Sequence, residues 1–138
     1  MISLATWIVW VHILAAAAWI GGAVSLLSLL SSPEIPATGR RLHVLTSRAM
    51  EVLVVTGVLN IVVRGASFSA SFSPPFFAML SFKMALFLVM AGLQIWLGIG
   101  WGRLDAPGLP LGRIRIGLIL QLVLGAMAVL AGLGVHAA

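Results

Sequence analysis

Long apolar segments separated by short polar ones make up most of the 138-residue chain. A membrane-spanning helix needs about 20 mostly apolar residues, and this pattern supplies four such segments with no room for a folded domain outside the bilayer. The pattern predicts an all-α, integral membrane four-helix antiparallel bundle that forms one transmembrane domain over residues 1–138. The predicted spans cover about 3–30, 46–63, 76–101 and 113–135, and the stretch 31–43 (SSPEIPATGRRLH) is predicted to be a loop.

Composition supports a lipid environment. The chain is 62% hydrophobic and 8% charged, and its mean hydropathy is +1.19, values far from those of water-soluble domains. The absence of cysteine excludes disulfides, iron–sulfur clusters and thiolate metal sites. No basic stretch precedes the first apolar segment, so a cleaved signal peptide is not expected.

The basic residues predict the orientation in the membrane. Arginines gather around the first and third connections, at positions 40, 41, 48, 103, 113 and 115, whereas Arg64 stands alone at the second. The positive-inside rule then places both termini outside and the first and third loops in the cytoplasm. We therefore expect a multi-pass protein of the cytoplasmic (inner) membrane whose surroundings are the lipid bilayer, and no nucleic-acid partner.

Counting residues from the span ends predicts which polar side chains share a depth. His12 on the first span and Lys83 on the third each fall roughly 10 to 12 Å below the outer end of a helix that rises about 1.5 Å per residue. Thr56 and Asn60 of the second span approach the same layer. A second, inner layer is predicted to hold Arg48, Glu51, Gln94 and Gln121, in which Arg48 and Glu51 either pair along one helix face or belong to a proton or ion path.

Lys83 is the only lysine in the chain and lies inside an apolar span. An ionisable residue at such a place is a functional hypothesis by default. Arginine stays protonated in proteins, whereas a buried lysine can become a neutral amine that ligates a metal or moves a proton. The alternative is that the long side chain reaches the outer interface.

His12 is the other candidate ligand, since a neutral imidazole commonly binds haem iron. His43, in the basic loop, and His136, near the C-terminus, are predicted to be solvated. The methionines lack close pairing and are predicted to pack rather than to bind copper. The tryptophans are predicted mostly to mark the membrane interfaces. The small residues after His12 serve close helix packing or leave space for a planar cofactor. Gly98 and Gly102 form a GxxxG, a dimerisation signal.

Three segments together resemble a known family. They are VHILAAAAWIGG around His12, VLVVTGVLN between Arg48 and Asn60, and FKMALFLVMAG around Lys83. In this order they resemble the copper-resistance protein D (CopD) domain and the related HemJ-type protoporphyrinogen oxidases. In HemJ-type proteins a histidine on the first helix and a lysine on the third are associated with a b-type haem, and these positions match His12 and Lys83.

The resemblance implies a membrane protein that binds haem b and acts in electron transfer or in the oxidation of a porphyrin, quinol or similar reductant. His12 and Lys83 would be the metal ligands, with Thr56, Asn60 and Arg64 near the propionates. HemJ-type proteins usually carry a histidine or similarly polar residue where this chain has Gln94, which weakens the case for porphyrin oxidation more than the case for haem. A copper or small-solute transporter and a non-catalytic subunit of a larger complex stay open as alternatives, as does a homodimer.

Overall fold

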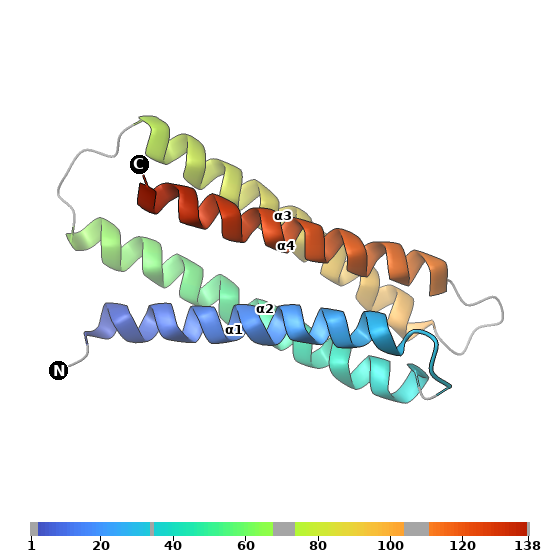
Figure 1. Ribbon diagram of the computed structural model, residues 1–138. Helices are drawn as coiled ribbons and strands as arrows, with labels where there is room; N and C mark the ends of the chain where they lie inside the picture. Colours follow the sequence, from blue (N-terminus) through green and yellow to red (C-terminus); the bar gives the residue numbers. More distant parts are fainter. Residues whose placement is uncertain (1–2, 34, 68–73, 104–110, 138) are drawn as a thin grey trace.

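The computed structural model describes residues 3–33, 35–67, 74–103 and 111–137. This part of the chain forms four helices, α1 (Leu4–Leu29), α2 (Ile35–Ser67), α3 (Pro74–Gly102) and α4 (Leu111–Ala137) (Figure 1). Each contains a stretch long and apolar enough to cross a membrane. The predicted all-α, multi-pass membrane architecture is therefore confirmed at this level.

The helices form a bundle in chain order. α1 packs along α2 and α3 along α4, while contacts between α1 and α4 and between α2 and α3 join the two pairs. Over the described residues α1 and α3 therefore lie diagonally across the bundle. Both termini are at one end, and the two pairs diverge toward that end (Figure 1).

The outside of the bundle is apolar. Large hydrophobic side chains such as Leu88, Ile95 and Leu130 are each about two-thirds exposed. Only 22% to 28% of the most apolar stretch of each helix is buried inside the bundle. Water would solvate this surface poorly, so the surface fits contact with lipid.

The second helix begins well before its predicted start. Residues 35–43 were predicted to belong to a loop, but α2 starts at Ile35 after a tight turn in which the Ile35 amide donates to the carbonyl of Ser32. Pro36 does not interrupt the helix, because the first-turn amides have no intrahelical acceptor and the fixed φ of proline suits that position. As a result His43 lies in a helix rather than in a loop.

Two tryptophans fill the core instead of marking the interfaces. Trp19 and Trp101 are each 2% exposed. The Trp19 ring rests on Gly125 and so joins α1 to α4, while the Trp101 ring rests on Gly39 and joins α3 to α2. The interface prediction is wrong for this pair, because each indole faces a glycine that leaves room for it. Trp7, Trp10 and Trp96 are exposed, as an interfacial or lipid-facing position requires.

Other glycines set close helix approaches. Gly22 of α1 lies against the Thr46 side chain of α2, which confirms that a small residue after His12 serves close packing. A Cβ at Gly98 would come 3.0 Å from Nε2 of His43. Gly98 therefore faces α2 within the bundle, so it cannot form the predicted dimerisation motif with the exposed Gly102.

Candidate functional site

The contacts between helices define which residues share a level. Gly22, Thr46 and Gln94 meet in one layer, since Gly22 touches the Thr46 side chain and Gln94 donates to the Thr46 hydroxyl. Ten residues from this layer toward the end that holds the termini lie His12 on α1, Thr56 on α2 and Met84, the neighbour of Lys83, on α3. His12 and Lys83 thus lie at one level of the bundle.

The His12 ring is held by Thr56. The Nδ1 atom of His12 lies 2.7 Å from the Thr56 Oγ1. The Thr56 hydroxyl also donates its single hydrogen to the carbonyl of Val52 at 2.6 Å. Because that hydrogen is used, the His12 Nδ1–H must be the donor to Thr56. This tautomer leaves the Nε2 lone pair available to a ligand, and no described residue bonds to it.

Lys83 lies on α3 across the bundle from His12. Its side chain is half-buried and lies close enough to His12 for the two groups to interact electrostatically. His12 and Asn60 are half-buried as well, while Thr56 is 6% exposed. Four polar groups from three helices therefore share the part of the bundle near the termini.

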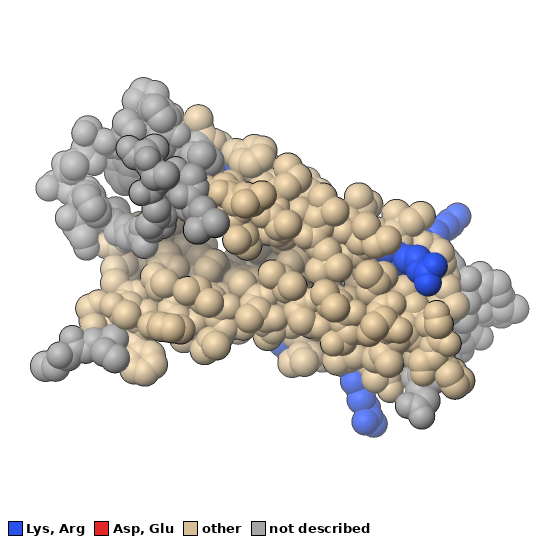
Figure 2. All heavy atoms as spheres, in the orientation of Figure 1, with Lys and Arg blue, Asp and Glu red and all other residues tan. Residues whose placement is uncertain are grey.

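Among the described side chains of α3 and α4, the core thins at this level. On α3 the last buried side chain toward the termini is Leu86, and on α4 burial ends at Gly125 within the described side chains. The surface is also recessed between α1 and the α3–α4 pair on the side of the termini (Figure 2). Among the described side chains, these polar groups therefore lie in the region where the two helix pairs diverge (Figure 1), which we call the outer cleft.

Two residues weighed above fall outside the described side chains. Arg64, the predicted propionate partner, lies in α2, and His136, predicted to be solvated, lies in α4, but only their backbone positions are described. Met84 is described and is 42% exposed, so it faces outward beside Lys83.

A second polar cluster occupies the middle of the bundle. The Gln94 amide nitrogen donates to the hydroxyls of Thr46 and Ser47, both at 3.0 Å, and its carbonyl oxygen accepts from Gln121 at 2.7 Å. Gln94 is 6% exposed and Gln121 is 1% exposed. The predicted meeting of the two glutamines is confirmed, and their hydrogen bonds join α2, α3 and α4.

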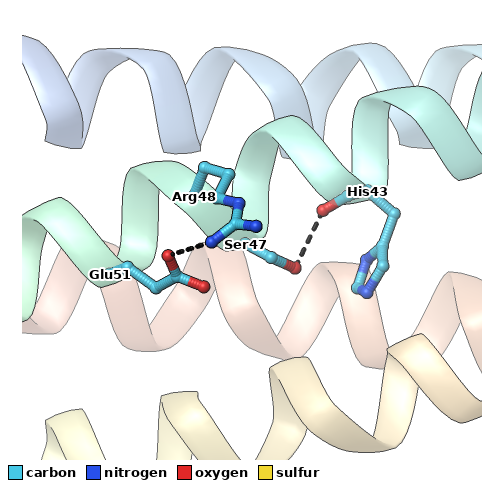
Figure 3. Close-up of polar contacts among 4 residues, drawn as sticks. All are labelled: His43, Ser47, Arg48 and Glu51. Atoms are coloured by element: carbon cyan, nitrogen blue, oxygen red, sulfur yellow. Dashed lines mark hydrogen bonds and ion pairs between the residues drawn. The ribbon is translucent and has the colours of Figure 1, made fainter.

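His43 belongs to the edge of this cluster, contrary to the prediction that it is solvated. Its ring is half-buried between α2 and α3, with the Trp101 ring centroid 6.3 Å away. Its carbonyl accepts hydrogen bonds from the hydroxyls of Thr46 and Ser47, both at 2.9 Å; Figure 3 shows the bond from Ser47. A sequence signal for this placement did exist, since His43, Ser47 and Met50 recur at the spacing of one helix face.

Arg48 and Glu51 do not join the glutamines as predicted. They pair with each other at 2.7 Å, which confirms the simpler of the two interpretations (Figure 3). Their side chains are 72% and 62% exposed, so the pair lies on the outer face of α2. A proton path through all four residues is therefore not supported, because the ion pair and the glutamines lie on different sides of the helix.

The hydrogen bonds of the glutamine cluster are expected to stabilise the bundle. Replacing Gln94 by leucine removes one of the two acceptors of the Gln121 amide nitrogen and leaves the Met90 carbonyl as the other. We expect the free energy of unfolding in detergent to fall by about 1 to 2 kcal/mol. Ile95→Leu, at an exposed neighbouring position, is the control and should change little. The double variant Gln94→Leu/Gln121→Leu should lose less stability than the sum of the two single losses. With both amides removed, no buried amide is left without its partner. Simple additivity would argue against the cluster.

An apolar groove of about 490 Å³ lies elsewhere, between α3 and α4. Leu93 and Trp96 line it from α3, and Leu120 and Leu124 from α4. It offers no side-chain donor for iron or copper, so we place the candidate site in the outer cleft.

Among the described residues, no three histidine, cysteine or acidic side chains come together as a metal site. The chain matches no family model, no curated protein and no solved structure. What its own residues establish is a four-helix protein with four candidate membrane spans, in which a half-buried histidine and a lysine share one level of the bundle.

Proposed function

We propose that the protein binds one b-type haem in the outer cleft and works in electron transfer or in the oxidation of a porphyrin, quinol or similar reductant. The observation that carries this proposal is the hydrogen bond from His12 Nδ1 to Thr56, which leaves the Nε2 lone pair of His12 available to a ligand. A metal-binding histidine typically has its other ring nitrogen held in this way. The resemblance to CopD and HemJ-type proteins points to the same pair, His12 and Lys83.

The residues present suit a haem. A bound haem would supply one-electron redox chemistry at its iron. His12 would provide the neutral imidazole, and Lys83 a second nitrogen once its amine is neutral. Thr56 holds the His12 ring, and Asn60, one turn further along the same helix, would bond a propionate. Arg64 would pair with a propionate at the end of the cleft.

The proposed orientation follows from the arginines. Arg40, Arg41, Arg103, Arg113 and Arg115 all lie toward the end where α1 turns into α2 and α3 into α4. Most of the blue surface visible in Figure 2 is at that end. In the cytoplasmic membrane this end would face the cytoplasm, so the outer cleft and both termini would face outward.

The absorption spectrum of the detergent-purified protein tests the proposal. We expect a Soret band, with α and β bands after reduction, because two nitrogen ligands give a low-spin haem. A colourless preparation that takes up no haem on reconstitution would reject it. Copper-dependent uptake into proteoliposomes would instead favour a transporter, and stable copurification with another polypeptide a non-catalytic subunit.

A further inference from the structure

The Arg48–Glu51 ion pair stands on the outside of α2, where the rest of the surface is apolar. The two side chains pair at 2.7 Å and are 72% and 62% exposed. Figure 3 shows that the pair and the His43 ring leave α2 in different directions. Neither residue contributes to the outer cleft or to the glutamine cluster, so the proposed function leaves the pair unexplained.

The helix contacts place this ion pair at mid-membrane depth. Gly22 of α1 meets Thr46 of α2, and His12 meets Thr56, so one antiparallel register relates the two helices. In this register Arg48 lies level with Ile20, and Glu51 lies level with Ala17. The apolar helix α1 runs over Leu4–Leu29, which puts its centre beside Ala17. A lipid-facing ion pair at this depth would be deep in hydrocarbon, where charged side chains are rare and face protein or water.

The ion pair is part of a regular seam along α2. Within the exposed face of α2, six side chains repeat at alternating intervals of four and three residues, namely Val44, Arg48, Glu51, Val55, Val58 and Val62, and Leu45, Val52, Val54 and Leu59 are exposed beside them. This is the heptad interval by which one helix packs along another, and β-branched valine is a common residue in such seams. We call these six residues the α2 seam. This spacing allows a second helix to pack along the α2 seam.

We propose that the α2 seam is the interface of a homodimer, in which a second copy packs its own α2 in parallel about a two-fold axis along the membrane normal. Copies inserted with the same topology meet residue against residue at equal depth, so Arg48 of one subunit lies one helical turn from the partner's Glu51. The two arginines then lie at one level and the two glutamates lie one turn away, so the four charges sum to zero and each arginine has a glutamate of either subunit within reach. A second copy of the chain therefore supplies the matching opposite charges at the matching depth, and lipid is excluded from them.

Cysteine crosslinking of the full chain in native membranes tests this interface, because the chain has no cysteine of its own. Val55→Cys lies in the seam and is 58% exposed in the parent chain. We expect mild oxidation to convert it to a disulfide-linked dimer, since seam positions bring Cα atoms within disulfide range. Val129→Cys is the control, because Val129 is 50% exposed on α4, and it should stay monomeric.

Charge reversal within the α2 seam tests whether the crosslinking depends on the ion pair or only on the closeness of two helices. Arg48→Glu in the Val55→Cys background puts four acids at the interface, and the crosslinked fraction should fall several-fold. Adding Glu51→Arg makes the four charges sum to zero again with their positions exchanged, and crosslinking should recover. Recovery would show that the single variant failed through charge and not through misfolding. Equal crosslinking of Val55→Cys and Val129→Cys, no effect of Arg48→Glu, or capture of a different polypeptide at Val55→Cys would each overturn the proposal.

Discussion

Replacing His12 by alanine is expected to leave the purified protein without haem. The variant removes the imidazole whose Nε2 the Thr56 bond leaves available, and no other described histidine lies at that level of the bundle. The haem-to-protein ratio, from the Soret absorbance and a haem extraction assay, should fall to background. His43→Ala is the matched control, because His43 is also half-buried on a bundle helix, and it should keep its haem.

Thr56→Val tests the role of the hydrogen bond. Valine keeps the shape of threonine and removes the acceptor of the His12 Nδ1–H. Loss of such an orienting partner typically weakens metal binding by about 10- to 100-fold, so we expect partial loss of haem. Full occupancy in the His12→Ala variant would reject His12 as a ligand whatever the result for Thr56→Val.

Lys83→Arg tests whether Lys83 binds the haem iron or only extends its charge to the membrane surface. Arginine keeps the charge and the long stem but cannot become a neutral ligand in a protein. If Lys83 binds iron, this variant should shift the Soret and α bands toward those of a haem with one protein ligand. An unchanged spectrum, with normal haem content, would mean that Lys83 serves only to place its charge near the membrane surface.

The second large effect is expected from adding one methyl group at Gly39. A Cβ there would overlap the Trp101 ring and would come 2.9 Å from its Cη2 atom. Trp101 is 2% exposed and is enclosed by the core, so the ring cannot move aside without opening the contact between α2 and α3. Overpacking of this kind costs about 1 to 3 kcal/mol, and we expect Gly39→Ala to lower the free energy of unfolding in detergent by that amount.

Gly21→Ala is the control for the glycine substitution. It adds the same methyl group to an apolar helix, but no atom lies within 4 Å of its Cβ position, so the stability should change little. Gly39→Ala combined with Trp101→Leu should destabilise by less than the sum of the two single effects, because the smaller side chain makes room. Equal stability of Gly39→Ala and the parent chain would show that Trp101 does not hold α3 against α2.

The fold and the shared level of the proposed ligands were predictable for simple reasons. A run of about 20 apolar residues in lipid can satisfy its backbone hydrogen bonds within itself only as a helix. A helix also rises by a constant amount per residue, so sequence position converts to depth. His12 and Lys83 could therefore be assigned to one level without knowledge of any contact.

The start of α2 was less predictable. Pro36, Gly39 and the arginines at 40 and 41 have the composition of a loop, yet the same residues are tolerated in the first turns of a helix. Which outcome occurs depends on what the segment packs against. Here Gly39 lies against Trp101, a residue more than 60 positions away in the sequence, and this contact requires the helix.

The sequence by itself determined the four helices, their order, their depth and the outward exposure of apolar residues. Only the tertiary structure decided which way each helix is rotated. In a lipid-soluble bundle both the inner and the outer faces of a helix are apolar, so no hydrophobic period separates them. Only the structure could therefore show that His43 and Gln94 face inward and that Arg48 and Glu51 face outward. The same holds for the hydrogen bond between the Nδ1 atom of His12 and Thr56.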